Sequence, residues 1–263
     1  MAQAVDRRGA AGEPLPSVYR SLEAAGAQIC KGQVMLVAGP ASAGKSLLVF
    51  NYLIGMKVPT LAFLLDGDQL TASARFASII TGDPFLKIRD NIDTYRPVLA
   101  DRAGHIQAHF EAEDKEALEL QLDAYEQRYG LPPDCIVLDN VGNISAGFEN
   151  EWPVVKAMLL WLDQVAKRDQ LAVIVTHHMT DIETTRPLSR SKLLGKGSQF
   201  PRCILSVAMD PYNGEFRVAV VKASSGPSDI SALHPITLYV DPAKMWLNEN
   251  KPAPKPEGGW GGY

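Results

Sequence analysis

Residues 39–46 read GPASAGKS, which matches the pattern G-x-x-x-x-G-K-[S/T] at every fixed position. Apolar runs at residues 34–38 and 47–50 flank this stretch. The context predicts a strand, a phosphate-binding loop and a helix, in which backbone N–H groups and the positive helix end meet phosphate charge. Lys45 would add a positive charge on the phosphates, and Ser46 would ligate Mg²⁺. The sequence therefore predicts a nucleoside triphosphate site. The expected contact residues are consecutive: Gly39, Pro40, Ala41, Ser42, Ala43, Gly44, Lys45, Ser46 and Leu47.

The composition is that of a globular protein. The chain has 263 residues, of which 46% are hydrophobic and 21% charged, and this size suits one domain with a substantial core. A net charge of −4 gives no overall attraction to nucleic acid or membranes, so a DNA contact would need a local basic patch. Three widely spaced cysteines argue against a disulfide framework. Because we find no signal-peptide pattern and no apolar run of about 20 residues, we expect a cytoplasmic protein without a membrane span.

Between two low-complexity ends, strand-like apolar runs alternate with helical patterns. We expect disordered tails at residues 1–16 and 248–263, the second rich in Pro and Gly, and one folded domain at residues 17–247. The expected helices cover residues 18–25, 45–56, 70–80, 115–129 and 152–167. The expected strands cover residues 33–38, 60–65, 105–110, 135–138, 171–175, 203–208, 216–221 and 236–240. The rest of 82–114 reads as loops. This order predicts an α/β fold, with a mostly parallel twisted sheet flanked by helices.

Acidic residues follow two of the expected strands. CIVLD ends in Asp139, about ninety residues after the phosphate-binding loop, and fits a Walker B element that orders water on Mg²⁺. The strand at 60–65 runs into Asp66-Gly67-Asp68, which places two carboxylates where a ligand binds in open α/β sheets. Such a carboxylate could orient the attacking water during hydrolysis. A solvated Asp-Gly turn is the alternative.

The order of the phosphate-binding loop, the acidic DGD cluster, the Walker B strand and VIVTHH at 173–178 resembles the RecA-like P-loop ATPases. The similarity is greatest to the DnaB- and RepA-type helicase branch and to phage-type recombinases, and it covers about residues 17–241. The resemblance implies that Asp68 stands where these relatives carry the catalytic glutamate, with Asp66 as the register alternative. Aspartate is one methylene shorter than glutamate, which implies slower hydrolysis.

The resemblance also implies a polar sensor of the γ-phosphate after the strand at 171–175. His178 fits that position best, and His177 and Thr176 are the alternatives. Near the end of the chain, VVKASSGPSD resembles the lysine-x-arginine finger that a neighbouring subunit inserts toward the γ-phosphate. Lys222 matches the lysine, whereas Ser224 stands at the position of the arginine.

A local basic patch follows the sensor. Residues 180–202 carry five cations against two acids, and the resemblance implies that a mobile DNA-binding loop lies here. An ordinary solvated loop is the alternative. Residues 140–150 form a second loop candidate, in which Phe148 could stack on a base or anchor the next helix. The expected DNA-binding residues are Arg186, Arg190, Lys192 and Lys196.

Together these features predict a single RecA-like ATPase domain that binds ATP and Mg²⁺ between subunits of a hexameric ring or filament. We expect a DNA-dependent ATPase of the helicase or recombinase kind, acting on single-stranded or branched DNA in replication or recombination. One alternative is an ATP-switched protein that binds or anneals single-stranded DNA with marginal hydrolysis. Two others are a signalling ATPase of the same fold and a nuclease built from Asp66, Asp68 and Asp139.

Overall fold

The computed structural model describes residues 9–111, 114–144, 151–179, 185–193, 198–224 and 226–251. Within these residues, nine strands form one sheet in the order β3-β2-β4-β5-β1-β6-β7-β8-β9. The strands are β1 Val34–Gly39, β2 Thr60–Leu64, β3 Ile106–His109, β4 Cys135–Asp139, β5 Ala172–His178, β6 Cys203–Asp210, β7 Glu215–Ala223, β8 Ile236–Asp241 and β9 Trp246–Asn248. The five strand pairs from β3 to β6 are parallel and the three from β6 to β9 are antiparallel. The predicted mostly parallel α/β sheet is therefore confirmed.

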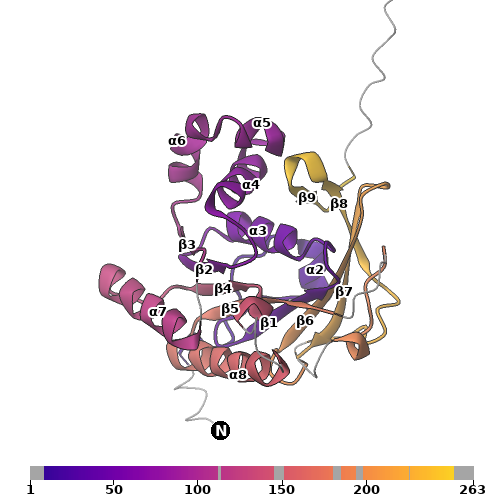
Figure 1. Cartoon of the computed structure of the whole chain (residues 1–263). Helices are drawn as coiled ribbons and strands as arrows, with labels where there is room; N and C mark the ends of the chain where they lie inside the picture. Colours follow the sequence, from indigo (N-terminus) through magenta and orange to yellow (C-terminus); the bar gives the residue numbers. More distant parts are fainter. Residues whose placement is uncertain are drawn as a thin grey trace, which may run out of the picture.

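Helices cover both faces of the sheet (Figure 1). On one face lie α3 Lys45–Met56, α4 Gln69–Thr81, α5 Phe85–Arg89 and α6 Ile92–Arg102; on the other lie α7 Lys115–Tyr129 and α8 Glu151–Asp169. The remaining helical elements are α2 Arg20–Ala24 and the 3₁₀ turns η1 Val141–Ile144, η2 Arg190–Lys192 and η4 Pro242–Lys244. Among the described residues, no helix has the length and apolarity that crossing a bilayer requires.

The central strands are buried on both faces because side chains alternate across a sheet. In β1, Met35 and Val37 join the apolar cluster that includes α3, while Val34 and Leu36 join the cluster that includes α8. All four are at most 2% exposed. Burial on both faces is typical of a strand in the middle of the sheet, which is where β1 lies. The loop at 39–46, which follows β1, therefore lies at the edge of the sheet where the parallel strands have their carboxyl ends.

The sequence prediction is wrong for most of residues 82–114. The structure has two helices there, α5 and α6, before the expected strand β3. The helical pattern is weak because α6 buries no residue and contains Pro97. In α5 only Ile88 is buried, against Ala74 and Ala77 of α4.

The packed domain reaches into both segments that the sequence assigns to the tails. At the N-terminal end, the Leu15 N–H donates to the Ile29 carbonyl at 2.7 Å, and the Leu15 side chain is buried. At the other end, Asn248 belongs to β9, and the Glu249 carboxylate accepts a hydrogen bond from the Ser21 N–H at 2.6 Å. Residues 1–8 and 252–263 lie outside the described chain.

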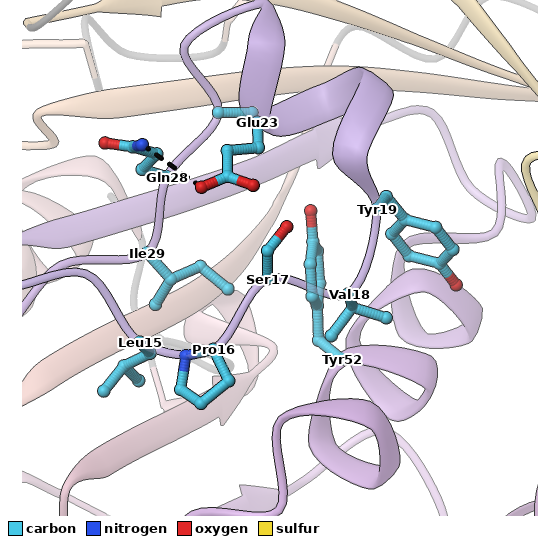
Figure 2. Close-up of a pocket in the computed structure, with 10 residues that line it drawn as sticks. Leu15, Pro16, Ser17, Val18, Tyr19, Glu23, Gln28, Ile29 and Tyr52 are labelled. Atoms are coloured by element: carbon cyan, nitrogen blue, oxygen red, sulfur yellow. Dashed lines mark hydrogen bonds between the residues drawn. The ribbon is translucent and has the colours of Figure 1, made fainter.

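The N-terminal segment packs on α3 around Tyr52. Figure 2 shows the Tyr52 ring among the side chains of residues 15–29 that line a small pocket. The Tyr19 and Tyr52 rings meet edge to face, with centroids 5.5 Å apart. Burial raises the pKa of Tyr52 well above its usual value, so the ring acts as a neutral packing group.

A buried asparagine fastens β9 to α3. The Asn51 amide nitrogen donates to the Met245 carbonyl at 3.1 Å, and its oxygen accepts from the Leu247 N–H at 3.3 Å. The same side chain also donates to the Leu47 carbonyl within α3 at 2.8 Å. Asn51 is 5% exposed, and without these bonds the burial of its amide group would cost free energy. These bonds hold β9 and the residue before it against α3.

Candidate nucleotide-binding site

The loop at 39–46 has the backbone that its glycines require. Gly44 caps α3 in the left-handed region, with φ of 86°, and a Cβ placed there would lie 2.6 Å from the Phe216 ring. At Gly39 a Cβ would lie 2.8 Å from the Val207 carbonyl. Neither position can hold a side chain without moving its neighbours, so both glycines have a steric reason, and Gly44 has a conformational reason as well.

Lys45 lies inside this loop and is 7% exposed. Its ammonium donates to the carbonyls of Pro40 at 2.7 Å and Gly39 at 3.1 Å, and lies 3.3 Å from Nδ1 of His178. Burial lowers the pKa of Lys45, while the carboxylates of Asp139 and Asp66 act in the opposite direction. A phosphate placed in the loop would offer this ammonium stronger, charged acceptors than the carbonyls it now uses.

Asp139 ends β4 as the sequence predicts and is 3% exposed. The Thr176 hydroxyl donates to its Oδ1 at 2.5 Å. Burial raises the pKa of Asp139, and hydrogen bonds from Thr176 and Ser46 partly offset that effect. Thr176, one of the alternatives for the sensor, therefore holds the carboxylate of Asp139, the residue predicted for the Walker B position.

The two acids of the DGD cluster have different surroundings. Asp68 caps α4: its carboxylate accepts from the Thr71 N–H at 2.8 Å and from the Thr71 hydroxyl at 2.7 Å. These bonds lower the pKa of Asp68. Asp66 instead lines the cavity above the phosphate-binding loop together with Lys45 and Ser46. Among the described residues, no three side chains of His, Cys, Asp or Glu are grouped to hold a metal ion, so the three-aspartate cluster of the nuclease alternative is not formed.

That cavity has a volume of about 450 Å³ and joins distant parts of the chain. It is lined by Ala41, Ser42, Gly44, Lys45, Ser46, Leu47, Asp66, Arg75, His178, Met209, Pro242 and Met245. The sequence prediction missed four of these, namely Arg75, Met209, Pro242 and Met245. Arg75 reaches the cavity from α4, with its guanidinium 5.8 Å from the centroid of the Phe50 ring. Met209 lies near the end of β6, Pro242 begins η4 and Met245 follows η4, and no local motif marks these positions.

The two histidines close β5 rather than following it, which corrects the expected end of that strand. They pair in register with the end of β1: His177 lies opposite Ala38 and His178 opposite Gly39. His178 lines the cavity, and its Nε2 lies 3.3 Å from the Asn140 amide nitrogen. Burial, and to a smaller extent the neighbouring His178 and Lys45, lowers the pKa of His177 to about 4. His177 is therefore a buried, neutral side chain, whereas His178 lines the cavity.

The remaining expected residues lie away from the cavity. Lys222 lies on β7 opposite Ile204, and its ammonium donates to the Ser198 carbonyl at 2.7 Å. Arg190 and Lys192 lie in η2, and Arg186 is exposed just before it. Lys196 and Phe148 fall outside the described residues.

Comparisons with known proteins agree with this geometry. No protein-family model matches the chain. It is 29% identical to the gene 65 protein of Mycobacterium phage L5, over 85% of this chain and 88% of that protein. It is 28% identical to the gene 65 protein of Mycobacterium phage D29, over 75% of this chain and 90% of that protein. These names state no activity.

Solved structures give a clearer likeness. The ATPase domain of G40P matches with a TM-score of 0.75 and 13% identity, over 95% of this chain and 96% of that domain. A DnaB-like replicative helicase matches with a TM-score of 0.75 and 13% identity. The match covers 94% of this chain and 66% of the helicase. A KaiC-like protein from Pyrococcus horikoshii matches with a TM-score of 0.59 and 15% identity, over 90% of this chain and 96% of that protein. The chain therefore has the RecA-like P-loop ATPase fold, in the form that DnaB-type helicase ATPase domains adopt.

Proposed function

We propose that this protein is a Mg²⁺-dependent ATPase that couples ATP hydrolysis to single-stranded DNA. The observation that carries the proposal is the meeting of Lys45, Ser46, Asp66 and His178 around one cavity at the carboxyl edge of the sheet. The cavity combines a phosphate-binding loop with a carboxylate and an imidazole, which suits phosphoryl transfer.

The residues present fit a magnesium ion. The Ser46 hydroxyl lies beside the Asp139 carboxylate, so the site offers the oxygen donors that Mg²⁺ binds. A nearby cation would also favour the ionised form of this buried carboxyl group. When bound, Mg²⁺ would bridge phosphate oxygens and neutralise the charge that develops on them.

We propose that Asp66, the register alternative, is the acid that activates water. Asp66 faces the cavity, whereas the Asp68 carboxylate is held by Thr71 at the start of α4. In hydrolysis, water would attack the γ-phosphorus while the bond to ADP breaks, and the Asp66 carboxylate would accept the water proton. Lys45 would stabilise the charge on the phosphate oxygens.

The fold likeness to DnaB-type ATPase domains supports a homo-oligomer and a DNA substrate, and the basic residues after β5 are the proposed DNA contacts. The phage relatives support action in the cytoplasm of an infected cell. An ATP-switched DNA-binding protein is the second candidate, because the short side chain at position 66 favours slow turnover.

One experiment separates these two candidates. ATP turnover is measured with increasing single-stranded DNA, in the presence and absence of Mg²⁺. A coupled ATPase shows Mg²⁺-dependent turnover that rises with DNA. Nucleotide-dependent DNA binding without such a rise supports the switch, and a chain that hydrolyses ATP but binds no DNA in any nucleotide state contradicts both.

A further inference from the structure

Six polar side chains line the nucleotide cavity in the described part of the chain, and they lie at one end of it. They are Ser42, Lys45, Ser46, Asp66, Arg75 and His178. The first three belong to the phosphate-binding loop, and Nδ1 of His178 lies 3.3 Å from the Lys45 ammonium. Asp66 and Arg75 also line a smaller recess together with Ser46. We call this the polar end of the cavity, and it suits the phosphates of a nucleotide.

Three other lining residues are apolar and come from the C-terminal part of the chain. Met209 lies near the end of β6, Pro242 begins η4 and Met245 follows η4. The smaller recess beside the polar end is lined by none of them. Both methionines are half-buried and pack on the apolar cluster that includes α3. These three residues, which we call the apolar end, therefore have one side on the core and the other on the cavity.

The apolar end offers few hydrogen-bonding groups to a ligand. A methionine thioether is at most a weak acceptor, and proline has no backbone N–H. The Met245 carbonyl already accepts from the Asn51 amide at 3.1 Å, and the Met245 N–H donates to the Pro242 carbonyl at 3.4 Å. A site that discriminates between polar ligands does so with hydrogen-bonding groups placed against them. The apolar end has few such groups to place against the edge of a base.

The backbone of Met245 is unusual and points to a ligand at this end. Its φ is 52°, in the left-handed region, which favours glycine and is uncommon for a residue with a long side chain. Backbone outliers of this kind cluster at sites that bind ligands. Here the outlier carries a side chain that lines the cavity, and the bond from Asn51 holds it in place.

The side chains of the apolar end suit the flat face of a ring. A methionine side chain is flexible and polarisable and makes favourable contacts with aromatic rings. Every nucleobase, purine or pyrimidine, presents such a face, whereas the bases differ in the donors and acceptors along their edges. Contacts with the face alone therefore hold all bases in much the same way.

We propose that Met209, Pro242 and Met245 hold the nucleobase by its face and leave its edge unread, so that the site accepts purine and pyrimidine nucleoside triphosphates alike. The inference rests on the proposed function, because the cavity must bind a nucleoside triphosphate for a base to reach the apolar end. It broadens the substrate from ATP to the class of nucleoside triphosphates.

The first test compares bases. ATP, GTP, CTP and UTP compete, with Mg²⁺ present, against a labelled and slowly hydrolysed ATP analogue on the whole chain. The affinities should agree within about tenfold, the most that a single neutral hydrogen bond contributes. Buried groups that read the edge would instead give a preference of up to about 10⁴-fold. A preference of more than about tenfold for one base overturns the inference and leaves the proposed function intact. If no nucleotide binds, the proposed function fails and the inference falls with it.

The second test assigns the contact to the methionines. Met245→Ala and Met209→Ala should each weaken ATP binding by about two- to tenfold, the size of a contact between sulfur and an aromatic ring. Inorganic tripolyphosphate, which has no base, should bind each variant as it binds the wild type. Its binding also shows that the phosphate-binding loop is still formed. Met245→Leu, which keeps an apolar side chain, should recover most of the ATP affinity.

Leu233→Ala is the matched control, because Leu233 is 73% exposed in the segment before β8 and does not line the cavity. It should change neither ligand's affinity. Equal weakening of ATP and tripolyphosphate in the methionine variants would mean that these side chains support the loop, and unchanged ATP affinity would mean that they do not touch the base. Either result overturns the inference.

Discussion

The ammonium of Lys45 lies 3.3 Å from Nδ1 of His178 and also donates to two carbonyls of the phosphate-binding loop. Because ammonium can only donate, Nδ1 of His178 accepts this bond, which requires an imidazole ring that carries no proton on Nδ1. A triphosphate would compete with His178 for the Lys45 protons. The end of β5 can therefore respond to the phosphate, and the basic residues at 186–192 follow it in the chain.

This relationship predicts that His178→Ala uncouples DNA from the nucleotide. ATP affinity should stay within a few-fold of the wild type because Lys45 and the loop remain, while stimulation of turnover by single-stranded DNA should be largely lost. Nucleotide titrations and turnover with and without DNA measure the two effects. Loss of ATP affinity with DNA stimulation intact would assign His178 to binding rather than to coupling.

The two acids of the DGD cluster should respond differently to loss of charge. Asp66→Asn should suppress turnover at nearly unchanged ATP affinity, because the amide cannot accept a proton from water. Asp68→Asn should keep most of the turnover, since asparagine also caps a helix and can accept from Thr71. Steady-state turnover and nucleotide titration of both variants decide the register. If Asp68→Asn shows the larger loss, the catalytic position is the one that the family resemblance implies.

His177 predicts a stability change in mild acid. Burial holds its pKa near 4 in the folded chain, below the usual value of about 6.5 expected when the chain unfolds. The unfolded chain therefore binds a proton first, and stability falls as the pH drops from about 6.5 to about 4, by up to about 3 kcal/mol. Above pH 6.5 the group contributes nothing to the pH dependence.

Urea unfolding at several pH values measures this effect. His177→Gln should flatten the slope between pH 4 and 6.5, while His234→Gln, a change at an exposed histidine, serves as the control. Equal slopes in the wild type and His177→Gln would show that His177 is not the group responsible.

Asn51 should be important for both stability and the nucleotide cavity. Asn51→Leu removes the partners of the Met245 carbonyl and the Leu247 N–H, which should cost about 2–4 kcal/mol of unfolding free energy. Because Met245 lines the cavity, ATP affinity should fall as well. Asn91→Ala, a change at an exposed residue whose side-chain amide donates to the Lys87 carbonyl of the preceding helix, should be nearly neutral in both measurements. Wild-type stability in Asn51→Leu would contradict the role assigned to this amide.

The sequence predicts the parts of the site whose geometry is local. The loop at 39–46 fixes its own backbone through Gly44 and its flanking strand and helix, and CIVLD places Asp139 at the end of a buried strand. The same reasoning fails for α6, which buries no residue and so shows no helical period. The sequence prediction also ends β5 too early, because the last two residues of that strand are histidines rather than apolar residues.

The sequence prediction also misses cavity residues that are brought to the site by contacts between distant parts of the chain. Met209, Pro242 and Met245 reach the cavity only because β6 lies beside β1 in the sheet and β9 with the residue before it packs on α3, and no spacing in the sequence marks that path. Asp66 and Asp68 are two residues apart and chemically alike, so a pattern cannot show that one caps a helix while the other faces the cavity.

ATP binding by Lys45→Ala tests the central claim most directly. The affinity for a slowly hydrolysed ATP analogue is measured with Mg²⁺ for the wild type, Lys45→Ala and Lys57→Ala, the last being an exposed lysine just after α3. The account predicts a loss of about 10- to 100-fold in Lys45→Ala, the size of a charged hydrogen bond, and no change in Lys57→Ala. ATP turnover should disappear in the first variant alone. Wild-type affinity and turnover in Lys45→Ala would show that the loop at 39–46 is not the nucleotide site.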